Sequence, residues 1–145
     1  MPMHIESARP ADAADMLALV AQNGLPTDGL NDHLASAVVA REDGRIVGTA
    51  ALELYSDGAL LRSVAVCAAQ RGRGLGHQLT EAAIALARDR AAPAIYLLTT
   101  TAERFFPRLG FEPIARADVP PRVRTSVEFT SACPSTAIVM RKSLE

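Results

Sequence analysis

The sequence predicts a mixed α/β fold in the order β-α-β-β-β-α-β-α-β-β, and three observations support this order. Asp43-Gly44 separates two apolar runs, a pattern typical of a hairpin between antiparallel strands. A glycine-rich loop at residues 70–76 is followed by apolar residues at helical spacing. Residues 59–99 form a strand–loop–helix–strand unit, which produces a parallel pair of strands. We therefore expect a mixed, mostly antiparallel central sheet flanked by helices.

The first half of the chain predicts one helix and four strands. Pro10 suits a helix start, apolar side chains then recur on one helical stripe, and Gly24 ends that stripe. A turn that begins at Leu25 leads into a short segment ending near Leu34. Three apolar runs separated by turns follow, and they predict an antiparallel meander. The expected elements are a strand at 4–6, a helix at 11–22, and strands at 37–42, 45–54 and 59–66.

The second half predicts two helices and three strands around an irregular segment. Pro93 follows the first helix, and Gly110 ends the second. Residues 114–134 contain Pro120-Pro121 and no clear periodicity, so we expect irregular structure there. The expected elements are a helix from residue 75 to about 88–90, a strand at 94–99, a helix at 102–109, a strand from 111 and a strand at 137–140.

Length and composition describe one globular domain. The 145 residues fit a single domain spanning 1–145, and 49% of them are apolar. Fifteen Lys and Arg against sixteen Asp and Glu give a net charge of −1. Nucleic-acid-binding domains are usually basic, and this chain also has few aromatic side chains for stacking on bases. We therefore expect neither a nucleic-acid partner nor a membrane-surface partner.

The cysteines, histidines and N-terminal residues give no sign of a metal site or of export. Cys67 and Cys133 lie far apart, and no Cys-x-x-Cys occurs, so we expect no zinc and no disulfide framework. Residues 1–6 lack the basic and apolar regions of a signal peptide. The apolar runs are shorter than the ~20 residues of a membrane span. The sequence therefore predicts a cytoplasmic protein without a metal.

The loop Arg71-Gly72-Arg73-Gly74-Leu75-Gly76 has the chemistry of an anion site. Glycines let backbone approach a ligand closely, and the free N–H groups at a helix start favour a negative charge. Two arginines add positive charge, so the loop predicts a phosphate or pyrophosphate cradle. His77-Gln78 follows where a P-loop needs Lys-Ser or Lys-Thr, and the spacing of a dinucleotide fingerprint is not met.

The loop resembles the acyl-CoA pyrophosphate loop of the GNAT N-acetyltransferases, whose pattern is Arg/Gln-x-x-Gly-x-Gly/Ala. Arg71-x-x-Gly74-x-Gly76 fits it. Residues 63–66 match the strand with a small bulge that precedes the loop in the family, and Ala102 with Phe106 to Phe111 resembles the family's later Gly-Phe motif. The element order matches as well. Within the family, residues 60–66, 96–106 and 125–134 are similar to the arsenic-resistance N-acetyltransferases.

The resemblance implies acetyl-CoA as co-substrate and a small-molecule amine as acceptor, with an amino-acid analogue bearing an acid group as a plausible class. It implies that the Val64 N–H stabilises the oxyanion and that the backbone at Val64 and Val66 holds the thioester and pantetheine arm. The expected cofactor-binding residues are Val64, Ala65, Val66, Arg71, Gly72, Arg73, Gly74, Leu75, Gly76, His77, Thr100, Phe105 and Phe106.

Proton transfer needs a base and an acid. Amines have pKa values of about 8–10.4, so a base helps to deprotonate the acceptor near neutral pH. Glu53, at the end of a strand, and Glu128, in the irregular segment, are the candidate bases. The family often places a Tyr where this chain has Phe106, which removes the usual acid. Tyr96, Ser131, Cys133 or water are the substitutes left open.

Arg62 stands among apolar strand residues and needs an anion. One hypothesis makes it a clamp for an acid group on the substrate, with Ser63 beside it; the alternative is an ion pair with Glu53 or Glu81. Regular alternation predicts that Arg62, Val64 and Val66 share one face of the strand. Cys67 and Cys133 are arsenic-binding thiols in one interpretation and small buried side chains in the other.

Two other functions remain open at this point. A non-catalytic acyl-CoA-binding or regulatory module would explain Phe106, and a protein or peptide N-acetyltransferase would need a peptide groove. Many family members are dimers, and the terminal strand offers an edge for pairing, so a homodimer stays open as well.

Overall fold

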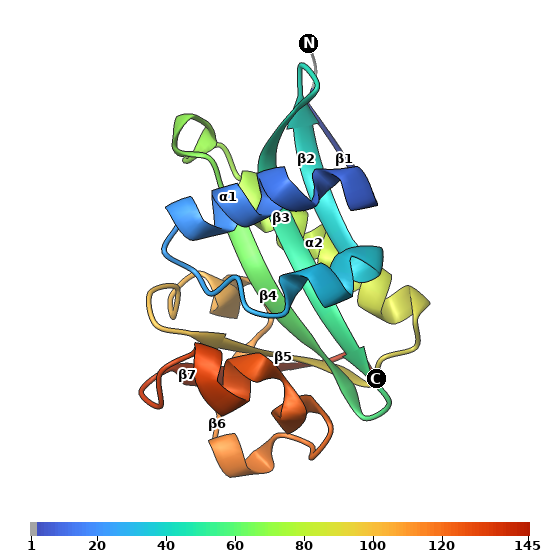
Figure 1. Cartoon of the computed structure of the whole chain (residues 1–145). Helices are drawn as coiled ribbons and strands as arrows, with labels where there is room; N and C mark the ends of the chain where they lie inside the picture. The colour runs from blue at the N-terminus through green and yellow to red at the C-terminus, as the bar shows by residue number, and fades with distance from the viewer. Residues whose placement is uncertain (1–2) are drawn as a thin grey trace.

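The computed structural model describes residues 3–145, which build one seven-stranded sheet in the order β1-β2-β3-β4-β5-β7-β6 (Figure 1). The expected antiparallel meander is present as β2, β3 and β4, and β4 pairs with β5 in parallel across the α2 crossover. Residues 1 and 2, where the segment without signal-peptide features begins, lie outside the described residues. The strands are β1 (His4–Ser7), β2 (Ala37–Glu42), β3 (Arg45–Tyr55), β4 (Gly58–Val66), β5 (Ala94–Thr99), β6 (Glu112–Ile114) and β7 (Ile138–Ser143).

The helices are two α-helices and several short turns. α1 and α2 lie on opposite faces of the sheet (Figure 1). They are α1 (Ala13–Gln22) and α2 (Leu75–Asp89). The 3-10 turns are η1 (Pro10–Asp12), η2 (Leu30–Ser36), η3 (Ala68–Gln70), η4 (Phe106–Leu109), η5 (Arg116–Asp118) and η6 (Val123–Thr125), and η7 (Glu128–Ala132) is a π-helical turn.

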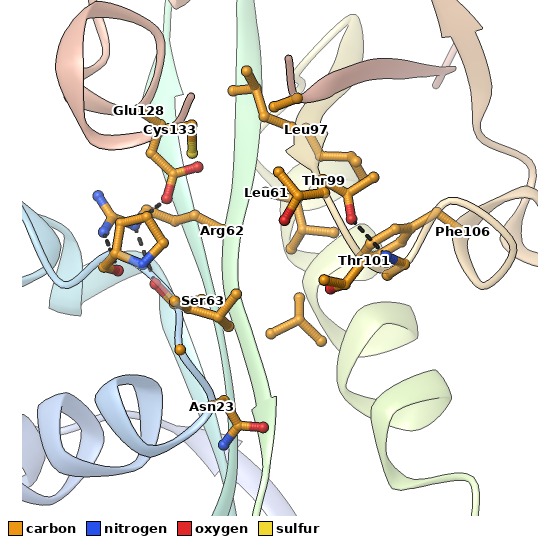
Figure 2. Close-up of a pocket in the computed structure, with 18 of the residues that line it drawn as sticks. Asn23, Leu61, Arg62, Ser63, Leu97, Thr99, Thr101, Phe106, Glu128 and Cys133 are labelled. Atoms are coloured by element: carbon orange, nitrogen blue, oxygen red, sulfur yellow. Dashed lines mark hydrogen bonds and ion pairs between the residues drawn. The ribbon is translucent and has the colours of Figure 1, made fainter. Parts of the chain in front are cut away.

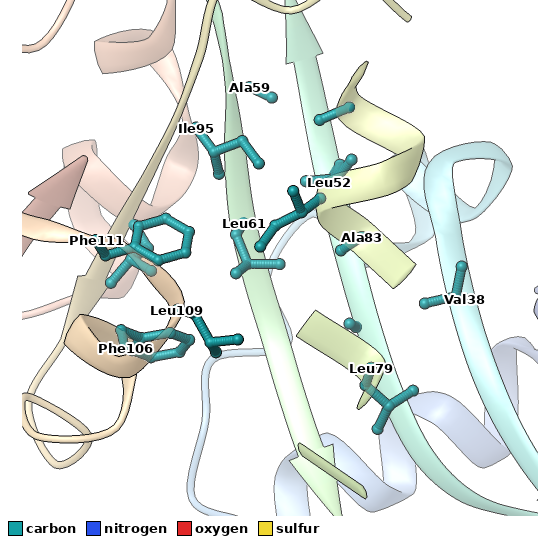
Figure 3. Packing of buried hydrophobic residues seen from close by; sticks show 14 of the residues in the cluster. Val38, Leu52, Ala59, Leu61, Leu79, Ala83, Ile95, Phe106, Leu109 and Phe111 are labelled. Atoms are coloured by element: carbon teal, nitrogen blue, oxygen red, sulfur yellow. The ribbon is translucent and has the colours of Figure 1, made fainter. Parts of the chain in front are cut away.

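Each face of the sheet has its own apolar core, because side chains alternate between faces along a strand. On the α2 side, Leu79 and Ala83 pack against Leu52 and Leu61 of the sheet (Figure 3). On the α1 side, Met16, Leu19 and Val20 pack against small side chains from β2, β3 and β4, which are Ala37, Val39, Ala51 and Ala65. The two helices thereby fix the central strands from both sides.

Two expected elements differ from the structure. The helix expected at 102–109 is the single turn η4, because Pro107 lacks an N–H donor and Gly110, at φ 93°, ends the turn three residues later. The last strand extends to Ser143, beyond the apolar run, because Arg141 pairs with Tyr96 and Ser143 with Ala94 of β5. Backbone pairing with the buried strand β5 thus extends β7 through the polar residues 141–143.

No helix within residues 3–145 is long and apolar enough to cross a membrane. In the same part of the chain, no group of three or more His, Cys, Asp and Glu side chains is placed to hold a metal ion.

Candidate active site

β4 and β5 separate after a short parallel contact, and a cleft opens between them. Their pairing is limited to Ala59 with Ile95 and Leu60 with Tyr96. Beyond these pairs, residues 61–66 of β4 have no strand partner on the β5 side, and several of them line a cleft of about 990 Å³ (Figure 2). Backbone polar groups on this edge are therefore available to a ligand.

A β-bulge at Ser63 changes the direction of the side chains in this part of β4. Ala51 pairs with Arg62 and Thr49 with Ala65, so one residue of β3 opposes two of β4. Ser63 has φ 58°, and its carbonyl oxygen accepts a hydrogen bond of 2.8 Å from the Thr49 hydroxyl. The expectation that Arg62 and Val64 share a face is therefore wrong: regular alternation fails across the bulge.

Arg62 and Leu61 point to opposite sides of β4, as alternation requires before the bulge (Figure 2). Arg62 faces the α1 side with its register partner Ala51, whereas Val64 packs on the α2 side. The cleft thus has a polar wall with Arg62 and Ser63 and a more apolar wall with Thr99 and Phe106.

The glycine-rich loop leads into the N-terminus of α2 beside the cleft. Gly74 is the N-cap residue at φ 77°, a left-handed conformation that favours glycine, and a Cβ there would meet no atom within 4 Å. α2 is 15 residues long, so its first N–H groups and its dipole favour an anion. The loop therefore leads into a helix N-terminus, the local geometry that the sequence predicts for an anion cradle.

The residues expected to bind the cofactor are not equally exposed to the cleft. Seven of them line it: Val64, Val66, Arg71, Gly76, Thr100, Phe105 and Phe106. Ala65 and Leu75 have buried side chains on opposite faces of the sheet, so they offer only backbone. Arg73 donates a hydrogen bond to Gln70, and the exposed His77 Nε2 lies 3.4 Å from Glu81 Oε1.

Sequence reasoning missed the segment after α1, which forms part of the polar wall. Asn23, Pro26 and Asp28 line the cleft, and the Asn23 side-chain oxygen accepts a hydrogen bond of 2.8 Å from Arg71. The Pro-Thr-Asp-Gly turn was the available signal, but a turn alone does not say which distant strand it covers.

Arg62 is an ion-pair residue rather than a free anion clamp. Its side chain is completely buried, and NH1 donates to Glu53 at 2.8 Å. Nε donates to Ser63 at 3.1 Å, and NH2 donates to the Pro26 carbonyl at 3.2 Å. Because every nitrogen has a protein partner, the geometry favours the ion-pair alternative. Glu81, the other partner considered, pairs with His77 instead.

Glu53 is buried behind Arg62 and is not among the residues that line the cleft. Its Oε2 accepts a hydrogen bond from Arg62 and lies 3.9 Å from His33 Nε2, and its Oε1 accepts from the Tyr55 hydroxyl. Burial acts to raise the pKa of Glu53, but hydrogen bonds from Ser126, Tyr55 and Arg62 outweigh it and lower the pKa. Glu53 is thus an ion-paired carboxylate without access to a ligand.

Glu128 opens the π-helical turn η7 and lines the cleft directly. Its carboxylate oxygen lies 3.5 Å from Arg62 Nε, and only 4% of the residue is exposed. Burial raises its pKa to about 7; Arg62 acts to lower it and Glu53 to raise it further. A carboxyl group with this pKa in a cleft suits proton transfer near neutral pH.

The raised pKa of Glu128 predicts a pH-dependent stability difference. Since the folded protein holds this proton more tightly than the unfolded chain, the carboxyl destabilises the fold as pH rises through about 7. The difference in unfolding free energy between Glu128→Gln and the wild type should therefore grow in favour of the variant from pH 5 to pH 9, by up to about 3 kcal/mol. Urea unfolding at both pH values measures the gap. A gap that stays constant or shrinks with pH would show that the carboxyl ionises freely.

A family model described as an acetyltransferase (GNAT) domain matches residues 33–113, which include β2 to β5, α2 and the glycine-rich loop. The chain belongs to the GNAT acetyltransferase family. It is 35% identical over 103 residues to an amino-acid acetyltransferase of Mycobacterium tuberculosis, covering 70% of this chain and 56% of that protein. It is 27% identical to an uncharacterized N-acetyltransferase of Chlorobaculum tepidum, covering 93% and 94%.

Solved GNAT-like structures superpose over nearly the whole chain. Rv2747 of Mycobacterium tuberculosis, in complex with CoA and NLQ, gives a TM-score of 0.83 at 26% identity and covers 98% of this chain and 99% of its own. N-acetylglutamate synthase of Neisseria gonorrhoeae, complexed with coenzyme A and N-acetyl-glutamate, gives 0.84 at 20% identity. This chain covers only 36% of that synthase, so the similarity to the synthase shows a shared fold and nothing more.

The positions of the candidate proton donors in this GNAT chain exclude two of them. The Tyr96 hydroxyl bonds to Arg141 and does not line the cleft, and Ser131 is an exposed residue outside it. Cys133 does line the cleft, but burial and the nearby Glu128 raise the pKa of its thiol to about 12. Cys133 therefore stays protonated at neutral pH. Both cysteines are free thiols.

Phe106 has a packing role at the edge of the cleft. Its ring makes edge contacts with Phe105 and Phe111 at centroid distances of 5.0 and 5.7 Å. Phe106→Leu should cost about 1–2 kcal/mol of stability and weaken acetyl-CoA binding, while the pH–rate profile keeps its shape. Denaturant unfolding and steady-state kinetics check this. A displaced or missing pH limb would reveal a proton-transfer group coupled to Phe106.

Proposed function

We propose that this chain is an acetyl-CoA-dependent N-acetyltransferase that acts on the amine of a small molecule. The observation that carries the proposal is that one cleft holds the unpaired edge of β4, the anion cradle of α2 and the buried carboxyl of Glu128. Acetyl-CoA would supply a thioester, whose acetyl group is transferred to the amine. Structures of related proteins hold CoA or acetyl-CoA.

The residues of the cleft divide into those that hold the CoA moiety and those that face the reacting carbonyl. The N–H groups from Gly74 to Gly76 would bind the pyrophosphate, and the edge of β4 would bind the pantetheine arm. The Val64 N–H follows the bulge on this edge. We assign it to the oxyanion that develops on the thioester carbonyl, because preorganised donors stabilise such charge.

We assign Glu128 as the general base, directly or through one water molecule. It lines the cleft, and its pKa of about 7 keeps a useful fraction of carboxylate and a useful affinity for the proton at neutral pH. Glu53 is the weaker candidate, because its lowered pKa and its contacts with Arg62 and Tyr55 commit it to a buried ion pair. Protonation of the departing thiolate falls to water, since Cys133 has too high a pKa.

An amino acid, or an analogue with a carboxyl, arsenic or phosphorus acid group, is the acceptor class we propose. The likeness to an amino-acid acetyltransferase and to arsenic-resistance N-acetyltransferases supports it. Arg62 is committed to Glu53, so the acid group needs another cation. Arg71 lines the cleft and bonds to the Val66 carbonyl and the Asn23 side chain, both neutral, so it is available to an acid group or to a CoA phosphate.

A panel experiment tests this function. Purified protein is incubated with acetyl-CoA and with amino acids, their phosphinic and arsinic analogues, or polyamines, and released CoA thiol is measured. We expect thiol release that depends on the acceptor, with a matching mass gain of one acetyl group on the acid-bearing amines. Tight acetyl-CoA binding without turnover on any amine would favour the non-catalytic acyl-CoA-binding function that Phe106 makes conceivable.

A further inference from the structure

Three ionisable side chains connect the polar wall of the cleft to the buried residue Glu53 behind it. Arg62 stands between two carboxyl groups, with Glu53 at 2.8 Å from NH1 and Glu128 at 3.5 Å from Nε. The Arg62 and Glu53 side chains are 0% and 1% exposed, so water does not screen their charges. Glu128 lies at the opposite end from Glu53, where it lines the cleft.

We propose that Glu53 and Arg62 act as a positioning pair that keeps the Glu128 carboxyl oriented toward the cleft and basic enough to accept a proton. The inference rests on the proposed role of Glu128 as the base. Neither Glu53 nor Arg62 is expected to touch the acceptor or the thioester, so both act through Glu128.

The unequal contacts of Arg62 give the physical reason. Glu53 takes the short contact and also accepts from Tyr55, so it neutralises most of the guanidinium charge. Nε is shared between the Ser63 hydroxyl and the longer contact with Glu128. If Arg62 paired with Glu128 alone, the carboxylate would be strongly stabilised and would be a weak base. Glu53 prevents this by holding the cation.

Other charged groups near Glu128 are few within residues 3–145. Arg62 comes from β4, and Glu53 and Tyr55 come from β3. A hydrogen bond from Cys133, which follows η7, acts to lower the pKa of Glu128, and Asp28, from the segment after α1, acts to raise it. His33 of η2 faces Glu53, and Arg116 acts on Cys133. None of these contacts Arg62 as closely as Glu53 does.

Glu53→Gln tests the inference, because glutamine keeps the shape: its carbonyl oxygen can still accept from Arg62, and its NH2 group can donate to the Tyr55 hydroxyl oxygen. Once this negative charge is removed, Glu128 is the one carboxyl group left to neutralise the positive charge of Arg62. We expect the midpoint of Glu128 ionisation to fall by about one pH unit or more. Carbon NMR of carboxyl-labelled glutamate, assigned with Glu128→Gln, measures it without any activity assay. Tyr55→Phe is the matched control, since it removes a hydrogen bond to Glu53 and leaves the charges unchanged.

The pH profile of kcat/KM gives the second readout. Its Glu128 limb should move to lower pH in Glu53→Gln, whereas a merely structural loss would lower the rate equally at every pH. The double variant Glu53→Gln/Arg62→Met removes both charges, and its Glu128 midpoint should lie at or above that of the wild type. An unmoved midpoint in Glu53→Gln by NMR would overturn the inference.

The same NMR series separates this inference from the proposed function. If the Glu128 midpoint moves as expected but the pH–rate profiles of wild type and Glu128→Gln coincide, the charge pair is right and the assignment of the base is wrong.

Discussion

Glu128→Gln will lower kcat by about 10²- to 10⁴-fold with the best acceptor, and the dissociation constant for acetyl-CoA will stay essentially unchanged. The fall is the usual contribution of a positioned general base. Binding is spared because Glu128 lies on the polar wall, away from the cradle formed by the α2 N-terminus. Stopped-flow or steady-state turnover, together with calorimetric titration of acetyl-CoA, measures both quantities.

Asp28→Asn is the matched control for this variant. Asp28 lines the same cleft, and the substitution removes the same negative charge without removing Glu128. We expect a small effect on kcat in Asp28→Asn. Equal losses in both variants would mean that the cleft needs negative charge to attract the amine, rather than a base at Glu128.

Gly74→Glu will raise the dissociation constant for acetyl-CoA roughly 100-fold or more, because a carboxylate would occupy the place of the pyrophosphate. A Cβ at Gly74 meets no atom within 4 Å, so the fold can accommodate the side chain. The left-handed φ of 77° adds a strain of about 1–2 kcal/mol, which a folded domain tolerates. Isothermal titration calorimetry with acetyl-CoA measures the change.

Gly44→Glu controls for the strain alone. Gly44 has a φ of 78° in the β2–β3 hairpin and also has no atom within 4 Å of a Cβ. The two variants should lose similar stability, and only Gly74→Glu should lose acetyl-CoA affinity. Wild-type affinity in folded Gly74→Glu would rule out the cradle.

The sequence predicted most of the sheet and the cradle because both have local causes. Asp43-Gly44 determines a hairpin by turn geometry, and the glycines of the 70–76 loop create bare backbone before a helix. Each signal lies within a few residues. The structure contains the sheet predicted from these signals, and the loop leads into α2 as expected.

The polar wall was harder to predict because its contacts join distant segments. Glu128 meets Arg62 across 66 positions of sequence, and the bulge at Ser63 reverses the alternation that placed Arg62 with Val64. A non-glycine residue at φ 58° has no sequence signal comparable with Asp-Gly. Residues 114–134 have no clear periodicity, so the sequence does not indicate which of their carboxyl groups reaches the cleft. The sequence therefore identifies Glu128 only as a candidate base. Its burial and its position in the cleft are seen only in the structure.

The most direct test of the central claim is the pH dependence of kcat/KM for wild type and Glu128→Gln, measured with two acceptors whose amines differ in pKa. We expect the wild type to show an ionisation near pH 7 that is the same for both acceptors, because it belongs to Glu128. In Glu128→Gln this ionisation should disappear, leaving only a limb that follows the amine. If the limb near pH 7 persists in Glu128→Gln, another group is the base and the account is wrong.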